Sequence, residues 1–469
     1  MPKEKIIIIG SGPAGMACAF TLSKSARPCV IIERDDAPGG FCQTVDFYNY
    51  LFDIGGHRFI SKSEEIKRLW QDVMGDDLLK VKRVSRIYYR KRYFNYPLSF
   101  GNTFYNLNPL EGFYCVISYL KSKYFNNNKE NTVEEWIVSR FGKRLFQIFF
   151  KTYTEKVWGV ACQNISADWA KQRIRGLSLR VAMQKAIFRM AKNTPKTLSE
   201  EFYYPKRGPG EFYRRLKDFS SGKGSQFIFG KEVVSIAHAS GKITAVFWED
   251  KSHGQRLEMP VDYLFSSMPL PLLVKSLQPA APDYVLQAAG KLKFRSFIAV
   301  NIILDRAEIF SDQWLYIHSP EVKLARVQNY KNWSPHMVED PNKTTLGLEY
   351  FCDEEDRIWK MNDVDLIGYA VEELERIGIT SRRHLINAFV VRRTYAYPIY
   401  YLDYQENVKI LRDYLSQFSN MQTMGRSGLF CYDNSDHALL TGIYAARNFL
   451  GDGYFDVWSV NTDERYLES

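Results

Sequence analysis

Residues 5–33 read KIIIIGSGPAGMACAFTLSKSARPCVIIE. The run Ile6–Ile9 is uninterrupted and β-branched, which is typical of a strand buried on both faces of a parallel sheet. Three glycines in G-x-G-x-x-G spacing follow at once, and Met16–Lys24 then has a helical pattern. A second apolar run, Cys29–Ile32, ends in Glu33. The stretch predicts a strand–turn–helix–strand unit that binds a dinucleotide.

Each part of this unit has a mechanical role. Gly10 permits the tight turn, Gly12 lets a pyrophosphate approach the backbone, and Gly15 lets the helix pack close to the strand. The free N–H groups at the start of the helix would face the phosphates, and Glu33 stands where a carboxylate accepts ribose hydroxyls. An ordinary glycine-rich turn is the alternative. The residues predicted to bind the dinucleotide here are Gly10, Gly12, Pro13, Ala14, Gly15, Glu33 and Arg34.

The composition narrows the class of protein. A chain of 469 residues is too long for one compact core, and its length predicts roughly three domains. Aromatic residues make up 15%, which suits a cleft that stacks rings and hydrogen-bonds sugars but also suits an ordinary core. The net charge of +10 would suit anionic small molecules, a membrane surface or nucleic acid. No run of five basic residues occurs, which argues against a nucleic-acid-binding tail.

The seven cysteines contain no C-x-x-C pair, so they predict reduced thiols and neither a disulfide framework nor a metal site. The first strand begins by residue 5, which leaves no room for a signal peptide. No apolar run approaches the roughly 20 residues that span a bilayer. We therefore expect a cytoplasmic protein without an integral membrane segment, with peripheral attachment left open and the oligomeric state undetermined.

Two further glycine pairs follow the first unit. Gly39-Gly40 stands in PGGFCQT, and Gly55-Gly56 stands in FDIGGHRF, directly before His57. Two such pairs close to a nucleotide fold predict backbone that approaches a flat ligand at two points. Two surface turns are the alternative.

The remaining pattern predicts a discontinuous organisation. Residues 84–98 read as a hairpin, and residues 109–200 are mostly helical, with a capping box over Thr132–Glu135. Further segments are expected as strands (226–237, 243–249, 261–268, 294–304, 314–328 and 344–351) or as helices (63–74, 363–378 and 436–450, the last with Asp436 as N-cap). The expected domains are a nucleotide-binding domain from 1–83, 220–275 and 420–469, a helical region over 84–219, and a sheet-containing domain over 276–419.

Five segments resemble the UDP-galactopyranose mutase family, a relative of the flavin amine oxidases and of protoporphyrinogen oxidase. They are the N-terminal fingerprint, Phe52–His57, Lys156–Val160 followed by Trp169 and Arg173, Arg326–Tyr330, and Gly425-Arg426 with Tyr432, Asn434, Asp436 and His437. The resemblance implies an α/β fold: a glutathione-reductase-type FAD-binding Rossmann domain with an inserted helical region and a second, antiparallel-sheet substrate domain.

The resemblance also implies an activity. It implies an FAD-dependent nucleotide-sugar mutase that contracts the sugar ring through reduced flavin without net redox change, in surface polysaccharide biosynthesis. The flavin would be reduced by NAD(P)H or another reductant. The alternative is an FAD-dependent oxidoreductase, an oxidase or desaturase of the amine-oxidase or protoporphyrinogen-oxidase type. A flavin-binding chain without chemistry of its own is a third class.

The resemblance assigns roles residue by residue. His57 would lie beside the flavin ring, and Arg173 and Arg326 would clamp the diphosphate, because guanidinium binds phosphate at two points. The alternative for His57 is a histidine in a tight turn whose hydrogen bonds are made to the backbone. The alternative for Arg173 is a position on a basic surface. The alternative for each aromatic residue is ordinary core packing. The expected cofactor contacts are Gly39, Gly40, Gly55, Gly56, His57, Val234, Met268, Gly425, Arg426, Asn434 and Asp436, and the expected substrate contacts are Trp158, Trp169, Arg173, Arg326, Asn329, Tyr330, Tyr395, Tyr397 and Tyr432.

Overall fold

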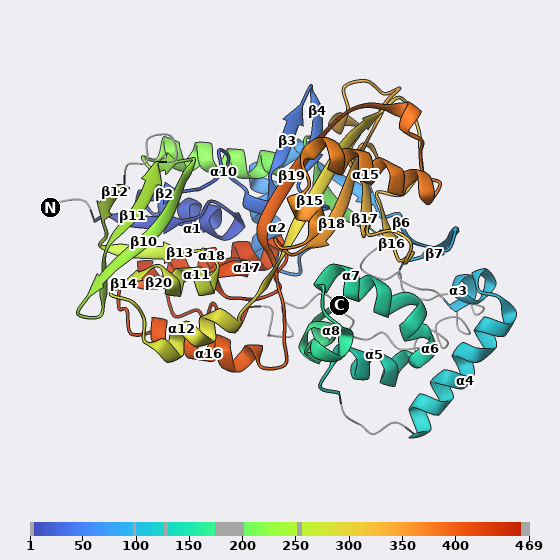
Figure 1. Cartoon of the computed structure of the whole chain (residues 1–469). Coiled ribbons are helices and arrows are strands. Elements are labelled where there is room, and N and C mark those ends of the chain that lie inside the picture. The colour runs from blue at the N-terminus through green and yellow to red at the C-terminus, as the bar shows by residue number, and fades with distance from the viewer. Residues whose placement is uncertain (1–3, 97–99, 126–129, 174–200, 251–255, 461–469) are drawn as a thin grey trace.

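A computed structural model describes residues 4–96, 100–125, 130–173, 201–250 and 256–460 (Figure 1). Its nucleotide-side sheet has five parallel strands in the order β20-β13-β1-β2-β9. The chain therefore returns three times to one sheet from distant segments. The bounds of the strands are β1 Ile6–Ile9, β2 Val30–Ile32, β9 Gln226–Ile228, β13 Tyr263–Ser266 and β20 Met421–Thr423.

Strand β1 is buried on both faces, as its four isoleucines predict. Successive side chains of a strand point to opposite faces. Ile6 and Ile8 pack with residues of α1 (Pro13–Lys24) and α18 (Ser435–Leu450). Ile7 and Ile9 pack instead with a second layer made by a four-stranded sheet and three helices. These elements are β10 Lys231–Ala239, β11 Lys242–Asp250, β12 Arg256–Pro260 and β14 Leu277–Gln278, with α11 Leu270–Lys275, α12 Asp283–Lys291 and α16 Tyr404–Leu415.

The second large sheet has seven strands in the order β19-β15-β18-β17-β16-β6-β7. All its neighbouring pairs are antiparallel except β16 and β6, which are parallel. Helix α15 (Asp363–Arg376) covers one face, and the helical region covers the other. The strands are β6 Ser85–Tyr89, β7 Arg92–Asn95, β15 Phe294–Leu304, β16 Trp314–Ile317, β17 Arg326–Asn329, β18 Thr344–Cys352 and β19 Leu385–Pro398.

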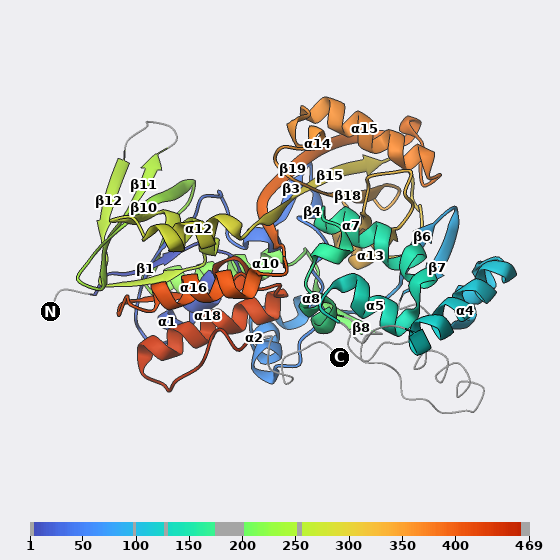
Figure 2. The same ribbon diagram turned by 60° about the horizontal axis from the view of Figure 1, so that its bottom comes forward.

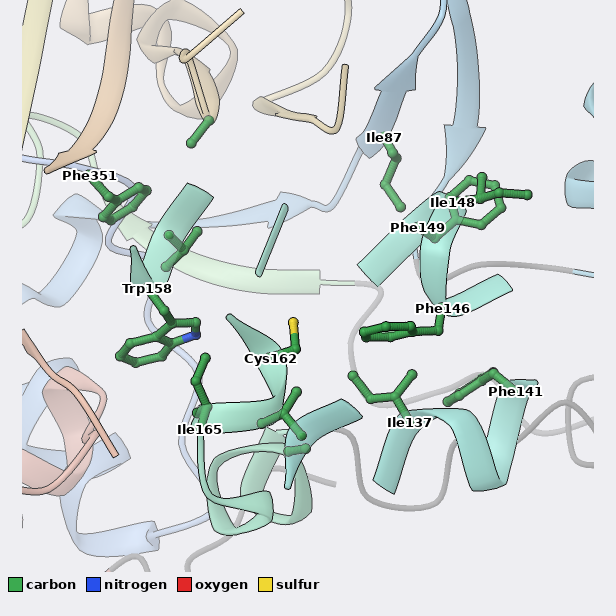
Figure 3. Packing of buried hydrophobic residues seen from close by; sticks show 14 of the residues in the cluster. Ile87, Ile137, Phe141, Phe146, Ile148, Phe149, Trp158, Cys162, Ile165 and Phe351 are labelled. Atoms are coloured by element: carbon green, nitrogen blue, oxygen red, sulfur yellow. The ribbon is translucent and has the colours of Figure 1, made fainter. Parts of the chain in front are cut away.

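The helical region has its own aromatic core (Figure 3). Phe146, Phe149 and Ile137 are buried there, and Trp158 and Phe351 join this core to the seven-stranded sheet. The expected capping box forms, since the Thr132 hydroxyl accepts the Glu135 N–H at 3.1 Å. The helices are α3 Phe100–Asn106, α4 Pro109–Phe125, α5 Val133–Phe141, α6 Lys143–Leu145, a π-helical turn Phe146–Lys151, α7 Thr152–Trp158 and α8 Ala167–Arg173.

Small elements join these parts. Hairpin β3–β4 carries the chain toward Gly55-Gly56, and β5 pairs with β8 directly before helix α10. The bounds are β3 Thr44–Phe47, β4 Tyr50–Asp53, β5 Leu78–Lys82, β8 Glu201–Pro205, α2 Glu64–Met74, α10 Gly210–Gly222, α13 Tyr330–Trp333, α14 Arg357–Lys360 and α17 Gly425–Gly428. Within the ranges that the structure describes, no helix is long and apolar enough to cross a membrane.

The predicted α/β fold with a separate second sheet is confirmed, but several details differ. The hairpin expected over 84–98 joins the seven-stranded sheet, and β19 was not predicted. The strand expected over 226–237 divides at Gly230, whose φ is +68°. The prediction of Asp436 as N-cap is wrong, because α18 begins at Ser435 and Asn434 occupies the N-cap. The part of the helical prediction over 174–200 lies outside the described residues.

Candidate functional site

A cleft opens at the carboxyl ends of β1 and β2, with about 810 Å³ of empty space including its mouth. Gly10, Gly12 and Glu33 line it together with the second glycine loop at Gly40 and Phe41. Ligands of open α/β sheets bind at this end of the strands. The other lining residues are Ile9, Ile32, Arg34, Asp35, Lys231, Glu232, Val233, Ser267, Met268, Pro269, Leu272, Arg393, Thr394, Tyr395 and Ser427.

The three glycines meet different constraints. Gly10 has φ +92°, a left-handed conformation that glycine adopts without strain. A Cβ at Gly15 would lie 1.9 Å from the Gly10 carbonyl oxygen, so the close helix–strand contact requires glycine there. A Cβ at Gly12 would have nothing within 4 Å. The space in front of the α1 N-terminus is therefore open and bounded by backbone, which fits a pyrophosphate.

Glu33 is buried at the end of β2. Its carboxylate accepts the Ser11 N–H at 2.6 Å, the Ser11 hydroxyl at 2.9 Å and the Asp35 N–H at 2.9 Å. Burial raises the pKa of Glu33, and the hydrogen bonds from Asp35 and Ser11 oppose that rise. The backbone thus fixes the carboxylate at the cleft, where the sequence predicts a contact to ribose. The glycine cradle and this carboxylate together fit the dinucleotide part of FAD.

Two predicted contacts near this cleft, Val234 and Tyr395, are placed differently from the prediction. Val234 is 38% exposed and points away, whereas its neighbour Val233 lines the cleft. A β-bulge between Val233 and Ser235 shifts the register at this point. Met268 lines the cleft as expected, but Tyr395, predicted to contact substrate, lines this cleft as well. We therefore move the proposed cofactor contact from Val234 to Val233.

His57 stands directly after the second glycine pair and is partly buried. Its Nε2 donates to the Ile54 carbonyl at 2.8 Å, and its Nδ1 faces the Cys42 sulfur at 3.7 Å. Burial, together with the charges of Arg426 and Arg326, lowers the pKa of His57 to about 4, although the hydrogen bond to Ile54 opposes the shift. The hydrogen bond from His57 to the backbone, which the alternative of a tight turn predicts, is therefore present. The imidazole ring is neutral at pH 7.

Arg326 lies in β17 and is mostly buried. Its Nε is 2.5 Å from Glu349 Oε2, and its Nη2 donates to the Tyr397 hydroxyl at 3.2 Å. Glu349 also accepts a hydrogen bond from Gln328 at 2.7 Å. The fully buried carboxylate of Glu349 therefore holds the guanidinium in place and offsets its charge.

Aromatic rings surround the second guanidinium, that of Arg426. Its central carbon lies 5.1 Å from the ring centroids of both Tyr397 and Tyr432. Those two rings are stacked at 5.4 Å, and Trp158 lies 5.6 Å from Tyr432 and 5.5 Å from Trp169. Arg426 donates to main-chain carbonyls, from Nε to Asp433 at 2.7 Å and from Nη1 to Ala396 at 3.3 Å. We call Trp158, Arg326, Tyr397, Arg426 and Tyr432 the ring-lined site.

Three other residues were predicted to contact the substrate: Asn329, Tyr330 and Arg173. Tyr330 is fully buried and donates to the Asp53 carbonyl at 2.7 Å, and Asn329 donates to the Phe310 carbonyl at 3.2 Å. Tyr330 packs in the core between the seven-stranded sheet and β4, and Asn329 ends β17. Arg173 ends α8, and its side chain lies outside the described part of the chain.

Helix α18 begins near the second arginine. The main-chain N–H of Asn434 donates to His437 Nδ1 at 3.3 Å, which completes a capping box. Asp436 is buried in the first turn of the helix. Gly425 precedes Arg426 with φ +78°, and its N–H donates to Thr441 of α18 at 2.9 Å. The helix start and the Gly425-Arg426 turn are thus fixed to each other.

Sequence reasoning missed several residues near Arg326. Tyr153 and Tyr316 lie edge to face at 5.6 Å, and burial raises the pKa of Tyr153 while the charge of Arg326 opposes that rise. Glu349 was also missed, because it stands in an apolar run that reads as a buried strand. A glutamate inside such a run is the one signal that could have identified it.

The chain is similar to a known protein family and to several known proteins. The family of flavin containing amine oxidoreductases matches residues 13–450. A 1-hydroxycarotenoid 3,4-desaturase from Flavobacterium sp. (strain P99-3) is 23% identical over 292 residues, which cover 53% of this chain and only 54% of the desaturase. A ferredoxin–NADP reductase from Rickettsia prowazekii (strain Madrid E) is 33% identical over 69 residues, 15% of this chain and 21% of the reductase.

Two solved structures share the whole fold. A crystal structure of reduced UDP-galactopyranose mutase superposes with a TM-score of 0.83 at 21% identity and covers 98% of each chain. A protein from Exiguobacterium sp. 255-15, provisionally assigned as a protoporphyrinogen oxidase, superposes with a TM-score of 0.73 at 16% identity, over 96% of this chain and 100% of that one. These likenesses confirm the fold that the sequence resemblance implied. The chain belongs to the flavin containing amine oxidoreductase family, and it is a flavoenzyme of that family.

Proposed function

We propose that this chain is an FAD-dependent nucleotide-sugar mutase that works with reduced flavin, in surface polysaccharide biosynthesis. The ring-lined site carries the proposal: two guanidinium groups are held among tyrosine and tryptophan rings, within the electrostatic reach of His57. A sugar diphosphate needs cations for its phosphates and flat, hydroxyl-bearing rings for its sugar and base. The site provides both chemistries together.

The two arginines have different parts in this proposal. Glu349 neutralises Arg326, so a diphosphate at Arg326 would compete with a buried carboxylate. Arg426 is bound by uncharged main-chain carbonyls, which leave its positive charge available for an anion. The resemblance implies a cofactor contact for Arg426; we instead assign to it the stronger contact with the substrate's phosphate. We keep Arg326 as the second contact, oriented by Glu349 and Tyr397.

The protein also sets the charge around the flavin. A reduced flavin supplies the nucleophile for ring contraction without net redox change. The ring of His57 is neutral and adds no positive charge, and its Nε2 is held by the Ile54 carbonyl. The positive end of the 16-residue helix α18 would stabilise negative charge on reduced flavin by roughly 0.3–2 kcal/mol. The rings of the site exclude water from the sugar.

The alternative function is oxidation or desaturation, and the similarity to a carotenoid desaturase favours it. A hydrocarbon substrate would require an apolar channel and an oxidised flavin. At the ring-lined site a hydrocarbon would cover two guanidiniums and the Glu349 carboxylate without giving them partners. Burying polar groups without partners is costly, so the site's charges favour the mutase.

The test is conversion of a nucleotide-sugar panel, with the products separated by HPLC. We expect conversion by enzyme reduced with dithionite under anaerobic conditions and none by oxidised enzyme. His57→Ala and Arg426→Gln should lose most activity and retain FAD, while Arg140→Gln, at a surface ion pair with Glu130, should keep full activity. Bleaching of oxidised enzyme by an amine or polyene, followed by recolouring in air with peroxide release, would instead support the oxidoreductase.

A further inference from the structure

Helix α4 is apolar on two opposite sides. Its inner side contains Cys115, which is fully buried, and Tyr119, whose backbone lies so near Gly142 that a Cβ there would approach to 2.7 Å. Its outer side exposes six large apolar residues at helical spacing, with Phe113 63% exposed and Tyr124 72% exposed. We call these residues the α4 stripe: Leu110, Phe113, Tyr114, Ile117, Leu120 and Tyr124.

The stripe lies at the edge of the molecule. Figures 1 and 2 show α4 on the outer side of the helical region, far from the five-stranded sheet. A contiguous exposed apolar patch marks an interaction surface. We therefore expect a binding partner to cover the α4 stripe.

Basic residues surround the stripe. Lys121 and Lys123 are exposed on the last turns of the same helix. The one acidic residue of α4, Glu111, forms an ion pair with Arg144 at its Nε, and a second bond from Arg144 Nη2 at 2.8 Å. Arg144 and, more weakly, Arg90 lower the pKa of Glu111, so both arginines lie near the N-terminal part of the helix.

We propose that the α4 stripe binds the surface of an anionic lipid membrane. Helix α4 has 17 residues and spans about 26 Å at 1.5 Å per residue, which suits a helix lying in the interface. Tyrosine rings favour the interface because one end is apolar and the other is wet, and lysines reach past them to the headgroups. The stripe contains two tyrosines, and Lys121 and Lys123 lie between its last two residues, Leu120 and Tyr124.

A second copy of the chain is the competing occupant. Two stripes pressed together would bring lysines of both copies to one interface, while Glu111 is already paired with Arg144. The whole chain carries a net charge of +10, so two copies also repel each other at long range. An anionic lipid surface complements the same charges, and the observations favour it.

The experiment is co-sedimentation of the full FAD-loaded chain with vesicles of phosphatidylcholine, with or without phosphatidylglycerol. We expect binding to the mixed vesicles and little binding to phosphatidylcholine alone. Phe113→Ser/Ile117→Ser should lower the bound fraction at least about tenfold, and Lys121→Gln/Lys123→Gln about fivefold per lysine at low salt. Tyr284→Ser/Val364→Ser, which changes exposed apolar residues on α12 and α15, should bind as wild type.

Folding and self-association are measured on the same samples. Flavin content and thermal unfolding should match wild type for all three variants, since every changed side chain is exposed. Equal binding by wild type and the Phe113→Ser/Ile117→Ser variant would overturn the proposal. So would absence of vesicle binding together with a dimer, by light scattering, that this variant converts to monomer. The vesicle assay does not involve nucleotide sugar, so it is independent of the proposed mutase activity.

Discussion

The dinucleotide cleft and the ring-lined site use opposite means to hold a ligand. At the cleft, one stretch of chain supplies a strand, a turn and a helix start, and the critical feature is open space beside backbone at Gly12. At the ring-lined site, side chains from α7, β17, β19, α17 and the segment between α17 and α18 meet, and the critical features are the placement and charge of Arg326 and Arg426. A binding loop made of backbone tolerates changes in the neighbouring side chains, but not a side chain added at one of its glycines. A site made of side chains depends instead on the residues that hold those side chains in place.

The largest expected effects separate the fold of the cradle from its ligand. Gly15→Ala places a Cβ 1.9 Å from the Gly10 carbonyl oxygen and should cost about 3 kcal/mol or more of unfolding free energy. Gly12→Val meets open space, so the protein should fold normally but purify without yellow FAD. Thermal unfolding and flavin absorbance check both variants. A fully flavinated Gly12→Val protein would contradict the assignment of this loop.

Next in size is the loss of nucleotide affinity at the ring-lined site. Arg326→Ala should weaken UDP binding by roughly 2–5 kcal/mol if the site is desolvated. Part of that loss would come from leaving Glu349 unpaired, so Arg326→Met/Glu349→Gln, which removes both charges, is the matched comparison. Calorimetric titration with UDP measures each. Unchanged affinity in both variants would place the phosphate contact on Arg426 alone.

A smaller expected effect is a change of stability with pH. It depends on Asp53, which lies just before the second glycine pair. Burial raises the pKa of Asp53 to about 7, although Tyr204 at 2.6 Å and Thr44 at 2.8 Å donate to it. The native state therefore binds a proton that the unfolded state releases near pH 4. The stability that this proton on Asp53 contributes is complete below about pH 4 and is lost as the pH rises through about 7.

Asp53→Asn should remove this dependence. Urea unfolding across pH 4 to 7 should show wild type losing up to a few kcal/mol more stability than the variant. Comparison with the variant cancels groups of opposite sign, such as His57, whose lowered pKa makes stability rise with pH over the same range. Parallel curves for the two proteins would show that Asp53 is ionised throughout.

The smallest effect lies outside both sites. Thr132→Ala removes the cap of α5 and should lower the unfolding free energy by about 1 kcal/mol. FAD content and UDP affinity should not change, because α5 belongs to the core of the helical region. Thermal unfolding with a UDP titration checks this, and altered UDP affinity would show that the helical core and the ring-lined site are coupled.

The contrast also explains what the sequence could predict. The first unit was predictable because strand, glycines, helix and Glu33 follow one another within 29 residues, from residue 5 to 33. The sequence does not reveal which of Val233 and Val234 faces the cleft, because the β-bulge that decides it leaves no mark in the two valines. The resemblance of Arg326–Tyr330 implies a substrate contact for Tyr330, whereas α13 begins at Tyr330 and its ring packs in the core. Such placements depend on tertiary packing between distant segments.

The stoichiometry of electrons and product tests the central claim most directly. Enzyme reduced once with a single equivalent of dithionite, then given a nucleotide sugar anaerobically, is followed by HPLC and flavin absorbance together. The mutase account predicts many product molecules per reduced flavin, with the flavin still bleached at the end. One product per reduced flavin, or recolouring of the flavin as substrate is consumed, would show that electrons leave with the product and would contradict the account.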